Sequence, residues 1–212
     1  MTIKDVKKNF IIDNAIDLFL AKSIGDVTIK DIAIKANVGE ATIYRYFSSK
    51  QNLVCDVAVK LENKIFEQYF NIPKTLNGFE QLSEFYNRYQ KIFNEHCELF
   101  KFINEFDAYL LREGKTDIGE YSSGLEQFKA VFSFAYNQGV QDGSIAAVAN
   151  WEIFYYATTH AMLELCKKLS VADIVIQDVN SHKKEEVATL VELILFKLKK
   201  WSILQSDVNI KL

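Results

Sequence analysis

The sequence is poor in the two residues that most often interrupt helices. Its 212 residues include a single proline, Pro73, and only eight glycines. Both are the strongest local breaks in regular structure, so their scarcity favours long helices over a fold rich in sheets and turns. Hydrophobic residues, in contrast, make up 49% of the chain, which is enough for a sizeable core. The composition therefore predicts an all-α fold.

Cysteine and histidine are also scarce, with three of each. Cys55, Cys97 and Cys166 are far apart and no CxxC pair occurs, which predicts reduced and mostly buried thiols. A redox-sensing role is the alternative interpretation. The three histidines are isolated and lack the spacing of metal ligands. We therefore expect no metal site and no cofactor.

Motifs of the common enzyme classes are absent as well. A carboxylate-bridged di-iron bundle needs Glu-x-x-His on two helices. The residues three positions before the histidines are Phe93, Ala157 and Val179, so this motif does not occur. The sequence also has no HExxH, phosphate-binding loop, GxGxxG or GxSxG pattern. These absences predict that the protein is not an enzyme.

The chain has no long apolar run that could cross a membrane. Near its start, Phe10, Ile11 and Ile12 are followed directly by Asp13, and Asp17 comes one turn later. Charges at this spacing are incompatible with the core of a signal peptide or with a membrane-spanning helix. We expect a cytoplasmic protein that does not associate with membranes.

What the chain does contain is a pattern for two short helices joined by a tight turn. The first is expected over residues 28–36, where Thr28 can cap the first turn. The second is expected over residues 40–47, where Ile43 and Phe47 are four residues apart and should face inward. Hydroxyl, aromatic and guanidinium groups are left on its other faces. Such a helix is suited to lie in the major groove of DNA.

The same segment carries positions that are typical of one protein family, namely Thr28, Ile32, Ala33, Ala36, Val38, Thr42, Ile43, Tyr44, Phe47, Lys50 and Leu53. Over roughly residues 10–55 the chain resembles the DNA-binding segment of the tetracycline-repressor (TetR) family of bacterial regulators. It departs from the family pattern in the turn, where Asn37 replaces the usual Gly and Gly39 replaces the usual Ser. Asn accepts left-handed backbone angles better than most residues, and Gly is an acceptable N-cap, so both departures are compatible with the fold.

The resemblance implies which side chains contact double-stranded DNA. The positions that contact phosphates in this family hold Thr28, Thr42, Tyr44 and Lys50. The positions that often face bases hold Glu40, Ala41 and Arg45. We assign Tyr46 to the same interface because it should also face outward. A carboxylate such as that of Glu40 can accept a hydrogen bond from a cytosine amino group, and Arg45 can form two with guanine. The alternative for Glu40 is that it only complements the helix dipole.

Charge is distributed in a way that agrees with a DNA-binding N-terminal segment. The formal net charge of the whole chain is −3. Residues 1–50, however, hold eight Lys or Arg against six Asp or Glu, whereas the remaining 162 residues hold 17 against 22. The modest basic excess thus coincides with the DNA-binding pattern.

Two domains follow from the pattern and the resemblance. We place a three-helix helix-turn-helix DNA-binding domain at residues 1–52 and a helical ligand-binding and dimerisation domain at residues 53–212, with about nine helices in all. Helices are expected over residues 7–23, from 48 or 49 to about 70, and over 77–95, 97–113, 119–140, 151–169 and 184–202, while 171–183 is not assigned.

Aromatic residues dominate the second domain. Most should simply build its core, as aromatic stripes usually do. The set is nevertheless larger than close packing requires, and the resemblance also implies a pocket, so we predict a cavity for a small apolar ligand. The candidate lining residues share three helix faces and are Phe102, Phe106 and Tyr109, then Phe128 and Phe132, then Tyr155, Thr159 and Met162.

The last expected helix carries an apolar stripe that is broader than one packing partner requires. By resemblance, the last two helices form a homodimer interface, and two-fold symmetry suits a palindromic operator. Interface candidates are His160, Leu190, Ile194, Leu198 and Trp201, with a buried and satisfied histidine as the alternative for His160. A ligand-responsive repressor is thus predicted, and the alternative is a helix-turn-helix adaptor or helical scaffold that acts through a protein partner.

Overall fold

The structure is a computed structural model that describes residues 2–114, 119–171 and 182–200. Within these ranges the regular secondary structure is helical, apart from one isolated bridge between Ile145 and Lys199. The helices are α1 (Ile3–Ala21), α2 (Ile29–Lys35), α3 (Glu40–Phe47), α4 (Lys50–Tyr69), α5 (Gly78–Glu95), α6 (Cys97–Glu113), α7 (Gly119–Asp142), α8 (Trp151–Ser170) and α10 (Lys183–Leu198). The all-α prediction is confirmed.

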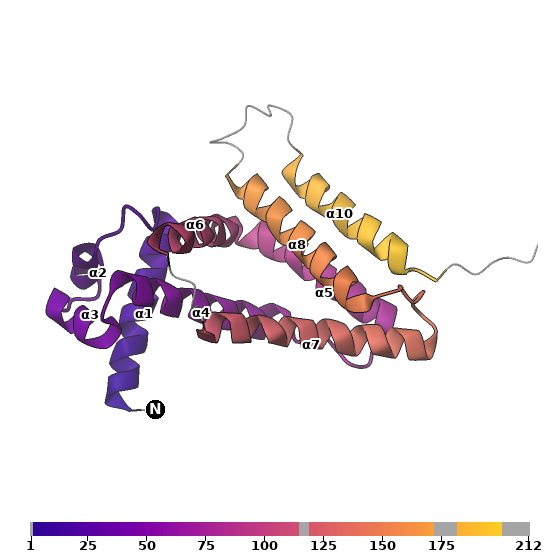
Figure 1. Ribbon diagram of the computed structural model, residues 1–212, viewed down its shortest axis with the longest axis horizontal. Coiled ribbons are helices and arrows are strands. Elements are labelled where there is room, and N and C mark those ends of the chain that lie inside the picture. Colours follow the sequence, from indigo (N-terminus) through magenta and orange to yellow (C-terminus); the bar gives the residue numbers. More distant parts are fainter. Residues whose placement is uncertain (1, 115–118, 172–181, 201–212) are drawn as a thin grey trace, which may run out of the picture.

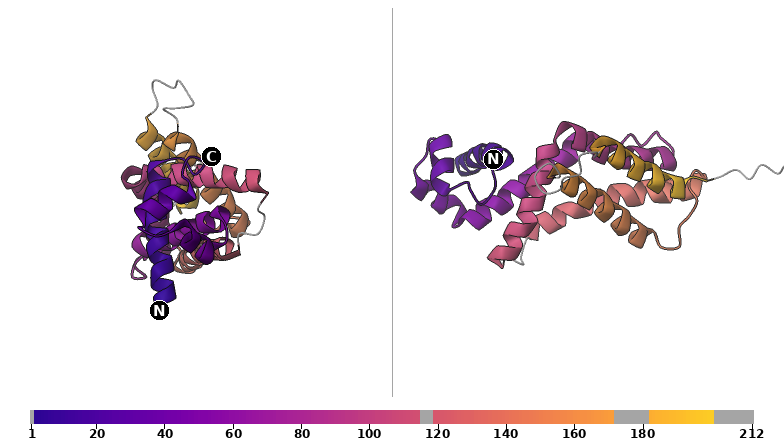
Figure 2. Two further views of the ribbon diagram at one scale, coloured as in Figure 1. Left: turned by 90° about the vertical axis from the view of Figure 1, so that its left-hand side faces the viewer. Right: turned by 90° about the horizontal axis from the view of Figure 1, so that it is seen from above.

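Helices α1, α2 and α3 form a small head at one end of an elongated molecule (Figure 1). Helix α4 leaves the head and runs into a larger body that is built from α5 to α10 (Figures 1 and 2). Inside the head, residues from all three helices are buried together, among them Ile11, Ala15, Phe19, Ile32, Ile43 and Phe47. The DNA-binding pattern thus has a packed core beneath it.

Helix α1 begins four residues earlier than the sequence pattern predicts. Thr2 and Asp5 form a capping box, in which the Asp5 amide donates to the Thr2 hydroxyl oxygen at 3.2 Å. The apolar stripe that guided the prediction starts only later, because the first two turns are exposed. Ile3, for example, is 89% exposed. The position at which α1 begins is therefore determined by its N-cap residue, Thr2, and not by the burial of apolar side chains.

The structure decides between the two starts predicted for α4, Ser48 and Ser49. Ser49 is the N-cap, and its hydroxyl oxygen accepts from the Asn52 amide at 3.2 Å. Ser48 instead ends α3, with a positive φ of 63°. The tight reversal between α3 and α4 therefore uses both serines, one for the turn and one for the cap.

In the body, α5 and α7 cross at very close range. A Cβ atom on Gly78, at the start of α5, would overlap the backbone of Gly139 near the end of α7. The two glycines allow this approach because neither has a side chain. Helices α8 and α10 then pack beside α5 on the opposite side from α4 (Figure 1).

Candidate functional site

Helix α3 is seated in the head by two side chains. Ile43 is 1% exposed and Phe47 is 3% exposed, as their spacing predicts. Gly39 precedes the helix as N-cap, and Asn37 takes a left-handed conformation with φ of 49°, which turns the chain from α2 into α3. The helix thus covers residues 40–47 as predicted and is fixed from one side only.

The other side of α3 carries the predicted DNA-contacting residues. Glu40, Ala41, Tyr44 and Arg45 are exposed, and Thr42 and Tyr46 are partly exposed. The Arg45 guanidinium carbon lies 5.6 Å from the centre of the Tyr46 ring, a cation–π distance. Figure 1 shows α3 at the outer end of the head, away from the body. Hydrogen-bond donors of three chemical types are therefore presented on one short helix.

Two further predicted DNA contacts lie elsewhere. Thr28 caps α2, where its hydroxyl donates to Asp31 Oδ2 at 2.7 Å and accepts from the Asp31 amide at 3.1 Å. The Lys50 ammonium donates to the Ile24 carbonyl oxygen at 2.5 Å and lies 5.8 Å from the centre of the Tyr109 ring. Partial burial lowers the pKa of Lys50. The structure thus places Lys50 at the junction of head and body, apart from the outer face of α3.

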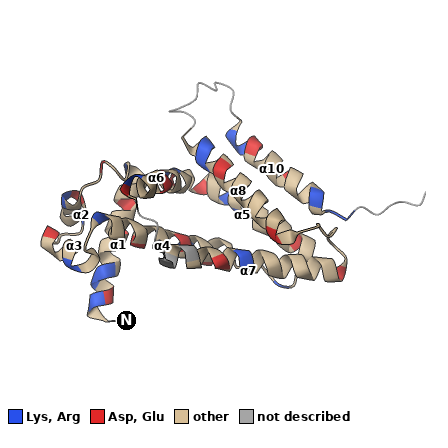
Figure 3. Ribbon diagram, viewed as in Figure 1, with Lys and Arg blue, Asp and Glu red and all other residues tan. Residues whose placement is uncertain are grey.

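Several charged residues of the head form ion pairs with one another or with α4; Figure 3 shows where the charged residues lie along the helices. Ion pairs join Lys8 to Asp56 at 2.8 Å, Lys35 to Asp17 at 2.9 Å and Lys60 to Asp13 at 2.7 Å. The basic residues of the head that are exposed and form no ion pair with any described residue are Lys4, Lys7, Lys22, Lys30 and Arg45. These five, more than the net charge, determine how the head can attract phosphate.

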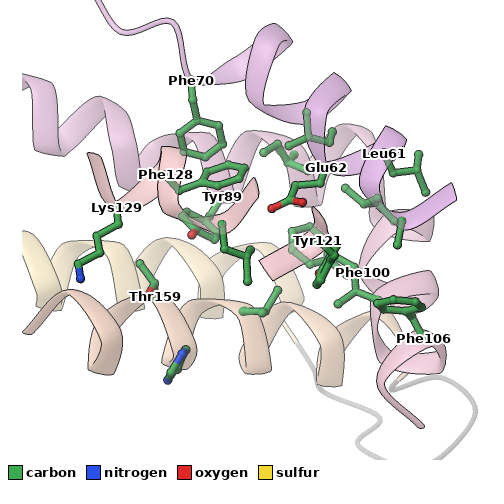
Figure 4. A pocket seen from close by; sticks show the side chains of 18 of the residues that line it. Leu61, Glu62, Phe70, Tyr89, Phe100, Phe106, Tyr121, Phe128, Lys129 and Thr159 are labelled. Atoms are coloured by element: carbon green, nitrogen blue, oxygen red, sulfur yellow. The ribbon is translucent and has the colours of Figure 1, made fainter. Parts of the chain in front are cut away.

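The body contains a cavity of about 310 Å³ between α4, α5, α6, α7 and α8. Its wall is mainly aromatic and aliphatic (Figure 4). Five of the eight predicted residues line it, namely Phe102, Phe106, Phe128, Tyr155 and Thr159. Cavities of this size and character hold small apolar ligands in many proteins.

The other three predicted lining residues are not on the cavity wall. Phe132 is completely buried in an aromatic cluster, 5.1 Å from the Tyr155 ring by ring centres. Met162 is completely buried as well, and Tyr109 packs near Lys50 at the junction with the head. The shared helix faces were predicted correctly, but a stripe cannot show which of its members face a void and which face a neighbouring helix.

Sequence reasoning missed the polar residue of the cavity, Glu62 of α4. This side chain is only 9% exposed, and neither of its carboxyl oxygens has a hydrogen-bond partner in the described structure. Burial raises its pKa to about 7. The carboxyl group reaches the backbone of α7, where a Cβ atom on Gly124 would overlap it. One detectable signal was its place on α4, since Glu62 lies in the same inward stripe as Ala58 and Ile65.

A second polar cluster lies on the cavity wall where α7 meets α8. The Lys129 ammonium is 2.9 Å from Glu152 Oε1 and donates to the Tyr156 hydroxyl oxygen at 3.1 Å. These two hydrogen bonds raise the pKa of Lys129. His160 is exposed and packs beside Tyr156, with ring centres 5.9 Å apart. The interpretation of His160 as a buried histidine is therefore wrong.

Helix α6 connects the cavity to the head, a role that the sequence did not reveal. Phe102 lines the cavity and also packs against Phe19 of α1, with ring centres 6.4 Å apart. On another face of α6, Glu105 accepts a hydrogen bond from the Ile24 amide at 2.8 Å. Lys50 binds the carbonyl group of the same residue. The loop before α2 is thus held from α4 and from α6 at once.

The predicted dimer residues of α10 divide into two groups. Ile194 and Leu198 are 6% and 0% exposed, because α10 packs them against α5 and α8 of its own chain. Leu190 is half-buried, whereas Leu193 and Phe196 are each 63% exposed. Trp201 lies outside the described residues. The exposed apolar side chains of α10 are therefore not the residues that were predicted for the interface, but lie on an adjacent face of the same helix.

The described residues also bear on membranes and metals. No helix within them is both long and apolar enough to cross a membrane. Nor do they bring together three or more His, Cys, Asp or Glu side chains in an arrangement that could hold a metal ion.

The sequence of the head matches the model of a known protein family. Residues 11–57 fit the family described as bacterial regulatory proteins, tetR family. A segment of 44 residues is 52% identical to YvkB, an uncharacterized HTH-type transcriptional regulator of Bacillus subtilis, and covers 21% of this chain and 23% of that protein. The chain therefore matches less than a quarter of this relative's length.

Two longer similarities include the body. KstR2, an HTH-type transcriptional repressor of Rhodococcus jostii, is 22% identical over 154 residues, which cover 72% of this chain and 74% of the repressor. The crystal structure of the transcriptional regulator FadR from Bacillus subtilis in complex with stearoyl-CoA superimposes with a TM-score of 0.66 at 16% identity, over 89% of this chain and 97% of FadR. At 16% identity, the similarity to FadR shows only that the two chains share a fold.

Proposed function

Because this chain belongs to the TetR family of bacterial regulatory proteins, we propose that it binds a palindromic DNA operator as a homodimer and represses transcription. The observation that carries the proposal is α3. Ile43 and Phe47 fix one face of this helix in the head core, while Tyr44 and Arg45 project from the other. A helix held in this way can enter the major groove without rearrangement.

In the proposed complex the two kinds of contact have different roles. The hydroxyl groups of Thr42 and Tyr44 bind phosphates and set the position of the helix, which does not depend on sequence. Arg45 reads a guanine, and Glu40 and Ala41 lie against neighbouring bases. Because Lys50 binds Ile24 inside the protein, a phosphate contact by Lys50 would require this internal hydrogen bond to break.

The proposed dimer places α8 and α10 of two copies against each other. The exposed side chains Leu193 and Phe196 of α10 supply apolar surface that the protomer itself does not bury. Leu193→Glu should therefore yield monomers in sedimentation analysis and weaken operator binding. Leu111→Glu is the matched control, because Leu111 is 84% exposed on α6, away from this seam. An unchanged dimer in Leu193→Glu would remove this face from the interface.

The cavity supports regulation by a small, largely apolar ligand. A ligand releases DNA only if it binds more tightly to the conformation in which the two heads do not fit adjacent grooves. Phe102 touches both the cavity and the head, and Glu105 on the same helix holds the loop before α2. Movement of α6 and α4 would thus change the spacing of the recognition helices. Such coupling typically changes affinity by roughly 5–150-fold.

The proposed role includes no catalysis, since the family members compared above are named as transcriptional regulators. It also places the protein in the bacterial cytoplasm, where the chromosome lies. The rival hypothesis is an adaptor or scaffold that uses the same helices to bind a protein partner. The two differ in one measurable property, which is salt-sensitive binding to an inverted-repeat duplex.

Selection of bound duplexes from a random pool, followed by titration, tests the proposal. We expect an inverted repeat, and Arg45→Ala should cost about 1–3 kcal/mol at one preferred base in each half-site, while non-specific binding weakens less, through the loss of one positive charge. Lys91→Ala, which removes one exposed basic residue on α5, is the charge-matched control. Selection of no duplex by the dimeric protein would favour the adaptor hypothesis.

A further inference from the structure

The cavity holds a carboxyl group for which the described residues supply no hydrogen-bond partner. Glu62 lies in the middle of α4, is more than nine-tenths buried, and has neither oxygen in a hydrogen bond. Figure 4 shows its carboxyl group directed into the cavity beside Tyr121. Buried polar groups without partners are rare in proteins and call for an explanation.

The opposite helix is shaped to admit this carboxyl group. Gly124 lies inside α7, where glycine destabilises a helix relative to alanine. Its φ angle is not positive, so the turn of the chain does not require a glycine there. The reason is instead steric, because any side chain at position 124 would begin with a Cβ atom that overlaps the Glu62 carboxyl. The buried Glu62 carboxyl group and the glycine inside α7 each destabilise the protein, and both are needed to place this carboxyl group in the cavity.

Among the described residues, no lysine or arginine is available to Glu62. The lysine on the cavity wall, Lys129, is bound to Glu152 and Tyr156, and His160 on the same wall packs beside Tyr156. The wall around the carboxyl group consists instead of aromatic rings, including those of Tyr89, Phe100, Phe106 and Tyr121. Ring faces attract cations, so this lining favours a positive charge beside Glu62 and disfavours a negative one.

We propose that Glu62 anchors the ammonium group of a hydrophobic amine, a ligand with an aliphatic or aromatic body and one positive charge. The proposal rests on the proposed regulatory function of the same cavity. An ammonium donates to both carboxyl oxygens and neutralises the buried charge, whereas a neutral hydroxyl satisfies one oxygen at most. The apolar body occupies the region lined by Phe70, Phe128 and Tyr155.

Calorimetric titration of the full-length protein without DNA tests the ligand class. 4-Phenylbutylamine, 4-phenylbutanol and 5-phenylpentanoate share a phenylbutyl body and differ only in a cationic, neutral or anionic end. We expect the amine to bind about tenfold or more tightly than the alcohol, and the acid to bind most weakly. Equal binding of alcohol and amine, or tightest binding of the acid, would overturn the proposal.

Two variants test the residue. Glu62→Gln keeps the size of the side chain but should abolish the preference for the amine, and Glu126→Gln is the control, because Glu126 is an exposed carboxylate on the cavity rim. Gly124→Ala should displace the Glu62 carboxyl and weaken binding of the amine more than of the alcohol. Retention of the preference for the amine in folded Glu62→Gln would show that Glu62 is not the anchor.

A parallel titration with operator DNA separates this proposal from the function on which it rests. If the native protein binds its operator but none of the three probes, the ligand class is wrong and the DNA-binding function stands. If it binds the amine but no duplex, the regulatory function fails although Glu62 still acts as the anchor.

Discussion

The head and the body of this protein treat polar side chains in opposite ways. In the described structure, the buried polar or charged side chains are Glu62, Gln81, Thr159 and Lys167, and all four belong to the body. The head keeps its polar groups at the surface and buries only apolar ones. This agrees with a head that meets a highly charged partner from outside and a body that encloses its partner.

Within the body, three of the four buried polar groups are satisfied. The Gln81 amide donates to the Leu76 carbonyl at 2.7 Å, and the Thr159 hydroxyl donates to the Tyr155 carbonyl at 2.7 Å. The Lys167 ammonium is 2.6 Å from Asp107 Oδ2. Of these four buried residues, Glu62 is the exception; outside this set, Arg88 Nε is the other buried side-chain atom in the described structure without a hydrogen-bond partner. The comparison teaches that the lack of a partner for Glu62 marks a place for a ligand.

The largest expected effect tests whether the head is held by apolar packing alone. Phe47 is 3% exposed under α3, so Phe47→Ala leaves a cavity that the small head cannot refill. We expect a loss of about 3–5 kcal/mol in the free energy of unfolding of the head, measured by denaturant titration. Operator binding should be lost with it, while the cavity of the body still binds ligand.

Phe134→Ala is the control for this change. Phe134 is 46% exposed on α7 of the body, and the same truncation there should cost less than about 1 kcal/mol. A small effect of Phe47→Ala would mean that contacts from the body stabilise the recognition helix, and the contrast between the two regions would then fail.

The second prediction uses the unpaired carboxyl group. Burial raises the pKa of Glu62 to about 7 from an ordinary value of 4.5, so the folded protein binds a proton more tightly than the unfolded chain does. The folded state is therefore favoured below pH 4.5, and this contribution is lost as the pH rises through 7. Between pH 4 and pH 8, the contribution of Glu62 alone should lower the stability of the protein by roughly 2–3 kcal/mol.

Glu62→Gln should remove this pH dependence and make the ligand-free protein more stable than the native one at pH 8. Denaturant titrations of both proteins between pH 4 and 8 measure the difference, and the exposed Glu126 supplies a Glu-to-Gln control that should change nothing. If the free energy of unfolding depends on pH in the same way in the native protein and in Glu62→Gln, the prediction is wrong and the carboxyl group of Glu62 has a partner in solution.

The sequence predicted the head more accurately than the body. The span of α3, the capping box of Thr28 and the left-handed Asn37 all rest on contacts within a few residues, and these predictions are confirmed. The start of α1 was misplaced because the apolar stripe was weighed above the capping threonine, Thr2, whereas Ser49 was one of the two starts predicted for α4. Capping residues thus predicted helix starts better than the apolar stripe did.

The cavity depended on packing between distant segments, which a helix stripe does not specify. Phe128 and Phe132 lie on one face of α7, yet one lines the cavity and the other fills the core. Glu62 was overlooked because a glutamate on a helix is usually solvated. Its burial depends on Gly124, which is 62 residues away in the chain. Only the fold brings these two positions together.

The smallest expected effect concerns Tyr44, whose ring is half-exposed on α3 and whose hydroxyl forms no hydrogen bond with the described residues. If this hydroxyl donates to a phosphate, Tyr44→Phe should weaken DNA binding by about 0.5–1.5 kcal/mol. The loss should be equal for operator and unrelated duplex, because a phosphate contact carries no sequence information.

The salt dependence distinguishes Tyr44 from the lysines of the head. A neutral hydroxyl displaces no counterion, so Tyr44→Phe should leave the slope of affinity against salt concentration unchanged, whereas Lys30→Ala would reduce it if Lys30 contacts a phosphate. Tyr156→Phe, on the surface of the body, is the control and should bind DNA as the native protein does. A loss in Tyr44→Phe that is confined to the operator would instead mean that Tyr44 reads a base. Tyr44 would then belong with Arg45 to the residues of α3 that read bases, and not to those that only position the helix.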